Sequence, residues 1–276
     1  MIEQLLRKLP LFKGKQRLAR LLLRNKMAIG RDLQLTGKYG CAYKIPNIKE
    51  NVGFELFING VYEEEIIDLI IERLPVNGVM LDIGANIGAI VIPVCKRRAD
   101  ISAIAIEASP RVYGYLQHNT ALNNLQNCIL INKAVTDKDN ESVHFFSPEE
   151  KFGKGSLSSV FTKAAETVET ISLDSVCKQN NYEEVDVIKI DIEGHEYGAF
   201  KGGAALLNKA NAPDILFEFV DWAEDLAKDY KPGDAQQLLL DYGYKLFHLN
   251  NKGDLVKVST PFTKGAAMIM ATKKTA

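Results

Sequence analysis

A glycine-rich segment with an acid in front of it is the part of the sequence best suited to bind a small ligand. It reads Asp82-Ile-Gly84-Ala-Asn86-Ile-Gly88 and lies between an apolar run at residues 79–83 and a helical pattern. Glycines at a strand end let the backbone turn tightly and let a ligand approach it closely. The spacing G-x-N-x-G differs from the G-x-G-x-x-G of pyrophosphate-binding loops. Asp82 is placed to attract a cation such as an amino group, so the segment favours a zwitterionic ligand over a pyrophosphate.

A second acid, Glu107, ends the next apolar run at residues 101–107. A carboxylate in this position can accept hydrogen bonds from both hydroxyls of an adenosine ribose, as it does in dinucleotide-binding enzymes. The alternative is an ordinary exposed carboxylate at a strand end. Because the glycine-rich segment precedes it, we interpret Glu107 as a residue that binds the ribose of a cofactor.

A third group of polar residues could supply a general base. Asp191, Glu193 and His195 alternate within one short segment after an apolar run, and Glu218 ends a later run. A carboxylate or imidazole beside a hydroxyl group can remove its proton. Ligands bind at the carboxyl edge of a parallel sheet, so we expect these four side chains to lie near the cofactor.

Two other roles stay open for these residues. Asp191 or Glu196 could cap the helix that follows, because a carboxylate stabilises a helix N-terminus. Asp, Glu and His side chains together are also plausible ligands for a divalent metal ion. The spacing of these residues matches no fixed metal-binding pattern, and we therefore expect no metal.

Short apolar runs alternate with helical patterns from residue 79 onward, and this alternation predicts the fold. Seven runs are expected to form strands, at residues 79–83, 101–107, 128–135, 185–191, 215–220, 244–249 and 266–271. Most are continuously apolar, as expected for strands covered on both faces, and helical patterns such as 110–123 and 195–209 separate several of them. The sequence therefore predicts an α/β fold with a doubly wound, seven-stranded, mainly parallel sheet. The last two runs, joined by a short polar loop at 250–253, should form an antiparallel hairpin.

The chain is expected to divide into an N-terminal cap at residues 1–61 and a ligand-binding domain at residues 62–276. A helix from near residue 62 to residue 74 leads into the second part. Tyr62 and Glu63 at its start could fold over the cofactor as a lid, or simply begin the helix. A β-insertion is expected at residues 136–184, with strand-like segments at 142–146 and 167–172 around a Gly/Ser/Lys-rich loop at 151–159.

The composition is that of a globular protein, with 276 residues of which 46% are hydrophobic and 25% charged. No apolar stretch reaches the roughly 18 residues that a membrane-spanning helix needs. Basic residues interrupt every apolar run near the N-terminus, which is unlike a signal peptide. The four cysteines have neither disulfide-framework nor zinc-site spacing. These features predict a cytoplasmic protein.

Positive charge is concentrated at the N-terminus. Residues 1–26 contain eight bases and one acid, a net charge of +7, which leaves −8 for the other 250 residues. Leucines alternate with the bases at roughly helical spacing, at positions 5, 6, 9, 18, 21 and 22. Such a segment could lie on an anionic membrane surface or contact a polyanion. The alternative is a pair of short helices packed on the domain with a solvated basic face, and the breaks at Pro10 and Gly14 favour it.

These motifs together resemble the FkbM-type family of class I S-adenosylmethionine-dependent methyltransferases. The resemblance rests on residues 82–88, Glu107 and the segment Ile188-Lys-Ile-Asp-Ile-Glu-Gly-His-Glu196, with support from residues 60–63 and 173–174. It covers about residues 30–272, nearly the whole chain. The K-I-D-I-E-G signature is the specific part, whereas the glycine loop alone is common to many proteins.

The resemblance implies a Rossmann-like fold and methyl transfer, usually to an oxygen atom of a sugar, glycolipid or secondary metabolite. It implies S-adenosylmethionine as cofactor and S-adenosylhomocysteine as product. By the same resemblance the cofactor would be contacted by Asp82, Gly84, Asn86, Gly88 and Glu107, with Ala134 near the adenine and Asp191 near the methyl donor. The expected partner is a small-molecule or glycan acceptor.

Two rival functions stay open. An NAD-dependent oxidoreductase could have a similar fold, but the G-x-N-x-G spacing and the terminal hairpin disfavour it. A non-catalytic glycan-binding relative could also keep the fold, although Asp82, Glu107 and Asp191 argue for a working site. Nucleic acid is not expected as a partner, because the catalytic region is net acidic and contains no basic binding module.

Overall fold

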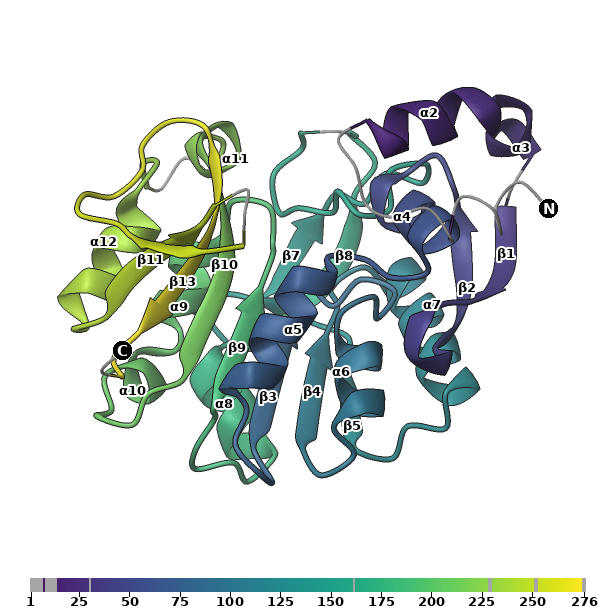
Figure 1. Cartoon of the computed structure of the whole chain (residues 1–276). Coiled ribbons are helices and arrows are strands. Elements are labelled where there is room, and N and C mark those ends of the chain that lie inside the picture. The colour runs from purple at the N-terminus through teal and green to yellow at the C-terminus, as the bar shows by residue number, and fades with distance from the viewer. Residues whose placement is uncertain are drawn as a thin grey trace.

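A large twisted sheet forms the centre of the protein (Figure 1). The computed structural model describes residues 7, 14–29, 31–160, 162–227, 230–250 and 253–274. Within these residues the sheet has eight strands in the order β12-β11-β13-β10-β9-β3-β4-β5. Their bounds are β3 Val79–Ile83, β4 Ser102–Ile106, β5 Cys128–Ile131, β9 Val187–Ile190, β10 Asp214–Val220, β11 Lys245–Leu249, β12 Leu255–Lys257 and β13 Ala266–Thr272. The strands from β5 to β10 run parallel and the other three pair antiparallel, so the predicted α/β fold with a mainly parallel sheet is confirmed.

The C-terminal end of the sheet differs from the prediction in one strand. The runs at 244–249 and 266–271 do pair antiparallel, as β11 and β13. The polar turn after β11 leads instead into β12, a short eighth strand on the outer side of β11; residues 251 and 252 of this turn lie outside the described part of the chain. The strand β12 is three residues long and largely exposed, so it carries no apolar run that a sequence pattern could reveal.

The run at 128–135, predicted as one strand, is broken in two. The strand β5 ends at Ile131, and β6, Ala134–Val135, joins a separate small sheet with the order β6-β8-β7. Asn132 lies at the break, where its side-chain amide donates hydrogen bonds to the carbonyls of Glu107 and Ala108 at 2.8 and 3.0 Å. These bonds tie the turn to the end of β4 and redirect the chain.

The small sheet contains the predicted insertion strands. The strands β7, Ser142–Phe145, and β8, Glu166–Ile171, pair antiparallel, while the loop between them folds back through a bridge from Phe146 to Ser156. The predicted insertion also contains a helix, because α8, Leu173–Gln179, follows β8 directly. Ser172 caps this helix by accepting a hydrogen bond from the backbone N–H of Ser175.

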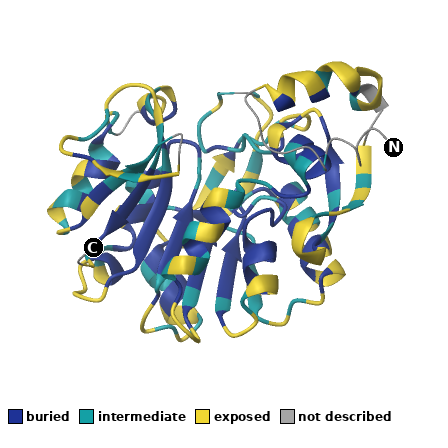
Figure 2. Ribbon diagram, viewed as in Figure 1, coloured by how far each residue is buried: buried dark blue, intermediate teal, exposed yellow. Residues whose placement is uncertain are grey.

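Helices cover both faces of the sheet. Side chains of successive strand residues point to opposite faces, and both faces are apolar. Met80 packs on one face with α4 Asn51–Asn59, α5 Glu64–Arg73, α6 Val91–Arg97 and α7 Pro110–Leu122. Leu81 packs on the other face with α8, α9 Glu196–Lys201, α10 Ala204–Leu207 and α12 Asp234–Asp241. One short helix, α11 Asp221–Asp225, follows β10. Figure 2 shows the strands as the most continuously buried part of the molecule.

The helical pattern at 195–209 is interrupted rather than continuous. The helices α9 and α10 are separated at Gly202 and Gly203. A Cβ atom on Gly202 would lie 2.3 Å from the carbonyl oxygen of Thr136, so the chain passes too close to the insertion for any side chain. The tertiary contact, and not the local sequence pattern, sets this boundary.

The N-terminal residues pack on the α4–α7 face of the sheet. The elements described here are α2 Lys15–Leu22, α3 Arg24–Ile29, and the antiparallel pair β1 Arg31–Thr36 and β2 Ala42–Asn47. Asn119 of α7 links this region to the sheet: its amide accepts from the backbone N–H of Lys44 and donates to the carbonyls of Lys44 and Ile87. The buried side chains of the N-terminal part and of this sheet face form one core. None of the helices described is both long and apolar enough to span a bilayer.

Candidate active site

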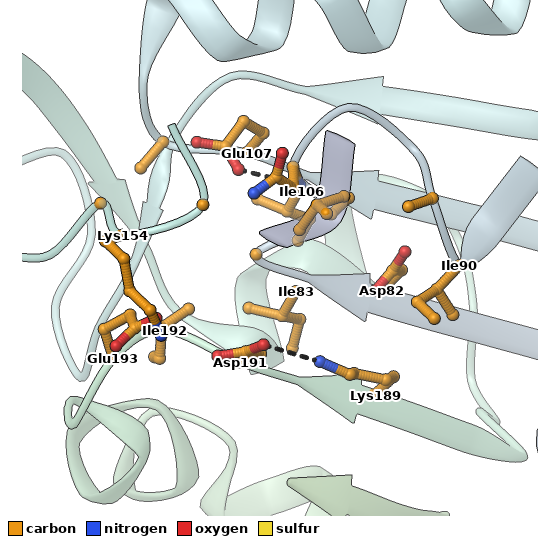
Figure 3. A pocket seen from close by; sticks show the side chains of 18 of the residues that line it. Asp82, Ile83, Ile90, Ile106, Glu107, Lys154, Lys189, Asp191, Ile192 and Glu193 are labelled. Atoms are coloured by element: carbon orange, nitrogen blue, oxygen red, sulfur yellow. Dashed lines mark hydrogen bonds and ion pairs between the residues drawn. The ribbon is translucent and has the colours of Figure 1, made fainter. Parts of the chain in front are cut away.

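A cavity lies at the carboxyl ends of β3, β4, β9 and β10, where such sheets bind ligands (Figure 3). Carboxylates and lysines from the strands and their ends, from the starts of α4 and α5 and from the insertion loop line it: Glu50, Glu63, Asp82, Glu107, Lys133, Lys154, Lys189, Asp191, Glu193 and Glu218. Gly84, Asn86, Ala134 and His195 line it as well. Of the predicted site residues, only Gly88 is not part of the lining.

The glycine-rich turn owes its shape to two close contacts. Gly84 has a φ of 76°, and a Cβ atom there would lie 1.9 Å from the carbonyl oxygen of Asp191. Gly88, with a φ of 87°, lies behind the turn, where a Cβ atom would meet Ile92 at 2.6 Å. Gly84 therefore lets two strand ends meet beside the cavity, whereas Gly88 lets α6 pack on the turn. That Gly88 contacts the cofactor stays a prediction; in the structure it packs against Ile92 of α6.

Asn86 completes the turn from a left-handed conformation with a φ of 53°. Its side-chain oxygen accepts a hydrogen bond from the backbone N–H of Ile87 at 2.8 Å, which holds this conformation. The backbone N–H of Asn86 itself donates to Oε2 of Glu107 at 3.0 Å. The turn and the end of β4 are therefore connected directly.

Asp82 is almost completely buried, with 2% of its surface exposed. Burial raises the pKa of this carboxyl to about 6, although Lys189 acts in the opposite direction. The Oδ2 atom has no hydrogen-bond partner among the described residues. A buried carboxylate oxygen without a partner is costly, so a ligand that carries a cationic N–H group would stabilise it.

Glu107 is also buried and is held in place by two backbone groups. Its carboxylate accepts hydrogen bonds from the N–H groups of Asn86 at 3.0 Å and Ser109 at 2.8 Å. Burial raises its pKa to about 7, against the effect of these bonds. Each carboxylate oxygen keeps a second lone pair that can accept from a hydroxyl group of a ligand. Ala134 lines the same end of the cavity from β6, not from the end of the third strand as predicted.

The sequence pattern missed Lys189, which lies inside the cavity from the middle of β9. Its ammonium group forms an ion pair with Oδ2 of Asp191 at 3.2 Å (Figure 3). Burial by itself would lower the pKa of Lys189, but the attraction of Asp191, Glu63 and Asp82 outweighs it and the pKa is raised. A lysine flanked by isoleucines in a fully buried strand is the signal that could have identified it.

Glu193 and Lys154 bring the insertion loop to the cavity. Lys154 Nζ lies 2.6 Å from Oε1 of Glu193, and Figure 3 shows the lysine reaching down to it from the loop. Glu193 adopts a φ of 52° just before Gly194, so the chain turns sharply there. Burial and the negative charge of Asp191 raise the pKa of Glu193 to about 7, while Lys154 opposes this shift.

Glu218 faces the same group of charges from β10. Burial and Asp191 raise the pKa of its carboxyl to about 7, and Lys154 and Lys189 act against the shift. Its carboxylate forms no hydrogen bond with any residue that the structure describes. His195 lines the cavity, and its Nε2 atom lies 3.1 Å from Oγ of Ser158 in the insertion loop. Within the described ranges, no three His, Cys, Asp or Glu side chains are arranged to hold a metal ion.

The side chains of Asp191 and Glu196 do not cap helix α9, which was one of the roles left open for them. His195 occupies the N-cap position of α9 without a side-chain cap bond. Glu196 accepts a hydrogen bond from the backbone N–H of Ile192 at 3.1 Å and so closes the loop between β9 and α9. Asp191 pairs with Lys189 instead of capping the helix.

Tyr62 and Glu63 also line the cavity, from the residues just before α5. Glu63 has a φ of 44°, a conformation uncommon for a residue with a side chain. Its Oε2 atom is buried without a hydrogen-bond partner among the described residues, and burial raises its pKa. Both residues therefore form part of the wall and do not simply begin the helix.

Comparisons with known proteins identify a family for this chain. The family model described as methyltransferase FkbM domain matches residues 82–246. The hexuronic acid methyltransferase AglP of Haloferax volcanii is 26% identical over 149 residues, which are 54% of this chain and 59% of the relative. The chain thus aligns with less than two thirds of that relative's length.

Among solved structures, the precorrin-6y C5,15-methyltransferase of Geobacter metallireducens is 15% identical with a TM-score of 0.44, over 78% of this chain and 90% of that one. TYW2 of M. jannaschii, in complex with AdoMet, is 18% identical with a TM-score of 0.43, over 88% and 86% of the two chains. At such identities the likeness concerns the fold alone. The family match, by contrast, spans more than half of the chain and contains the cavity residues from Asp82 to Glu218, and this chain therefore belongs to the FkbM family of methyltransferases, with S-adenosylmethionine as its cofactor.

Proposed function

We propose that this protein transfers a methyl group to a hydroxyl oxygen of a sugar, glycolipid or secondary metabolite. The observation that carries the proposal is the presence of two sets of carboxylates in one cavity. One cavity is lined by two carboxylates suited to the cofactor, Asp82 and Glu107, and by three further carboxylates at and after the ends of β9 and β10, Asp191, Glu193 and Glu218. The first pair suits the cofactor, and the second group suits deprotonation of an acceptor. The hexuronic acid named for the relative supports a sugar acceptor.

The carboxylates of Asp82 and Glu107 fit the polar groups of S-adenosylmethionine. The unpartnered Oδ2 atom of Asp82 would bind the ammonium group of the methionine moiety. Glu107 would accept hydrogen bonds from the ribose hydroxyls, while Ala134 would leave room for the adenine. When bound, the cofactor supplies an electrophilic methyl group on a sulfonium.

Glu218 is the proposed general base for the acceptor hydroxyl. Its carboxylate has no hydrogen-bond donor among the described residues, and burial places its pKa near 7. A base whose pKa lies near the working pH is substantially ionised and still binds a proton well, and both properties favour general-base catalysis. Glu218 would take up the proton of the acceptor hydroxyl, while the cofactor would supply the methyl group by cleavage of its sulfur–methyl bond and leave as S-adenosylhomocysteine.

Asp191, Glu193 and His195 would position the acceptor. Asp191 is held by Lys189 and Glu193 by Lys154, so both carboxylates have fixed directions. Fixed polar groups align the reacting atoms without further loss of entropy. His195, beside Ser158, would contribute a further hydrogen bond to a sugar hydroxyl.

The rival functions have less support. Membership of a methyltransferase family argues against the NAD-dependent oxidoreductase. A non-catalytic glycan-binding relative would have no need for a buried carboxylate near pKa 7 beside the cofactor site, but only an activity measurement separates it from an enzyme.

The test is transfer of a radioactive methyl group from S-adenosylmethionine to a panel of neutral sugars, uronic acids and glycolipids. A labelled product that resists alkali supports an ether formed at a hydroxyl. A product that releases methanol in alkali is an ester of a carboxyl group, and it would overturn the hydroxyl proposal. Asp191→Asn should keep binding of S-adenosylhomocysteine and lose transfer, whereas loss of both would mean that Asp191 belongs to the cofactor site.

A further inference from the structure

Helix α2 has an apolar face that the described part of the protein leaves uncovered. Its inner face packs on the domain through Ala19, and the adjoining Leu23 is also buried. The exposed side of the helix carries Leu18, Leu21 and Leu22, with exposed fractions of 42%, 72% and 51%. Figure 2 shows this outer side of α2 as an exposed strip on the rim of the molecule. A group of large apolar side chains in water marks an interaction surface.

The charged residues of α2 and α3 are all basic. Residues 14–29 contain five bases and no acid. Arg20 lies over the ring of Phe54 and donates to the carbonyl of Lys49, so it anchors α2 to α4. Arg17 and Arg24 are exposed, and neither forms a hydrogen bond or ion pair with a described residue. At about 100° per residue, Arg17 lies about 40° from Leu21 around α2, and Arg24 is the first residue of α3.

We propose that the exposed surface made by Arg17, Leu18, Leu21 and Leu22 of α2 and by Arg24 of α3 docks on a membrane surface that contains anionic lipids. Leucines at the boundary between headgroups and acyl chains, with arginines beside them, are the pattern of an interfacial helix. A second copy of the chain fits less well, because a symmetric contact through this face would bring the arginines of both copies together. A bare polyanion would leave the three leucines in water.

Docking here would place the membrane next to a helix that is packed on the wall of the cavity. Gln16 of α2 donates to Glu55 of α4, and the first residues of α4, Asn51 and Val52, line the cavity. In Figure 1, α2 lies at the end of the molecule toward which the parallel strands point. The docking surface and the active site therefore share one supporting helix.

The test is flotation of the full chain with phosphatidylcholine vesicles that either contain or lack phosphatidylglycerol. We expect binding to the anionic vesicles only, weakened by salt. Because each arginine near an anionic surface is worth about 1 kcal/mol, or about fivefold in affinity, Arg17→Glu/Arg24→Glu should lower binding by about 25-fold or more. The triple variant Leu18→Ser/Leu21→Ser/Leu22→Ser should abolish it.

Matched controls lie elsewhere on the surface. Val76→Ser changes another exposed apolar side chain, and Lys245→Glu/Lys257→Glu reverses two exposed charges at the far edge of the sheet. Both controls should bind vesicles like the parent, and all variants should keep binding of S-adenosylhomocysteine as evidence of folding. Equal binding to both vesicle types, no binding to either, or a dimer in solution that the leucine variant dissociates would each overturn the proposal.

Discussion

Lys189 and Asp191 form an ion pair of 3.2 Å between a buried strand residue and the first residue after that strand. The two side chains point to the same face because residues two apart in an extended chain do so. Lys189 thereby places a positive charge among three acids, Asp191, Glu63 and Asp82. This ammonium group allows several carboxylates to share one cavity at neutral pH.

Replacing this lysine should destabilise the protein strongly. In Lys189→Met the neighbouring carboxylates would lose their compensating charge, and breaking such a buried pair costs about 3–5 kcal/mol. Lys201→Met is the matched control, since it breaks an exposed ion pair to Asp137 that is worth about 1 kcal/mol or less. Urea unfolding at pH 7 measures both changes. Equal effects of the two variants would show that Lys189 has no special role in stability.

Methyl transfer should depend on the ionisation of Glu218. Because its pKa is raised to about 7 and the carboxylate form is the base, turnover should rise with pH through about 7 and then level off. Glu218→Gln should lower turnover about 100-fold or more, the usual contribution of a general base, and leave binding of S-adenosylhomocysteine intact. Glu183→Gln, at an exposed position, should leave the rate and its pH profile unchanged. A parent-like rate in Glu218→Gln would exclude Glu218 as the base.

Cofactor binding should depend on the charge of Asp82. Its pKa is raised to about 6, so the carboxylate is ionised at pH 8 and becomes protonated as the pH falls through about 6. Binding of S-adenosylhomocysteine, measured by calorimetry, should weaken over this range because the partner of the ammonium group is lost. Asp82→Ala and Glu107→Ala should both abolish detectable binding. Tight binding by the Glu107 variant would rule out its ribose role.

Gly84 should tolerate no side chain. In Gly84→Ala the Cβ atom would lie 1.9 Å from the Asp191 carbonyl oxygen in a left-handed conformation, so we expect a loss of at least about 2 kcal/mol and of cofactor binding. Gly114→Ala is the control, because this glycine is in α7 and a Cβ atom there meets nothing within 4 Å. Alanine is the better helix former by about 0.8–1 kcal/mol, so this variant should be more stable than the parent. Thermal unfolding of the two variants should shift in opposite directions.

The sequence by itself determined the fold class, the mainly parallel character of the sheet and the acids at its carboxyl edge. Continuous apolar runs identify buried parallel strands, and an acid at the end of such a run must lie at the edge where ligands bind. Asp82, Glu107, Asp191 and Glu218 could therefore be placed in one region before any coordinates were known. The local residue pattern is sufficient here because a strand that is buried on both faces consists mainly of apolar residues.

The tertiary structure decided everything that depends on contacts between distant segments. It brought Lys154 of the insertion loop to Glu193, 39 positions away, and placed Lys189 among acids from three elements. It also packed Gly88 against α6, ended β5 at Ile131, just before Asn132, and added the exposed strand β12. Such distances and burials arise only when the chain has folded, since no periodicity along the sequence records which remote side chains meet.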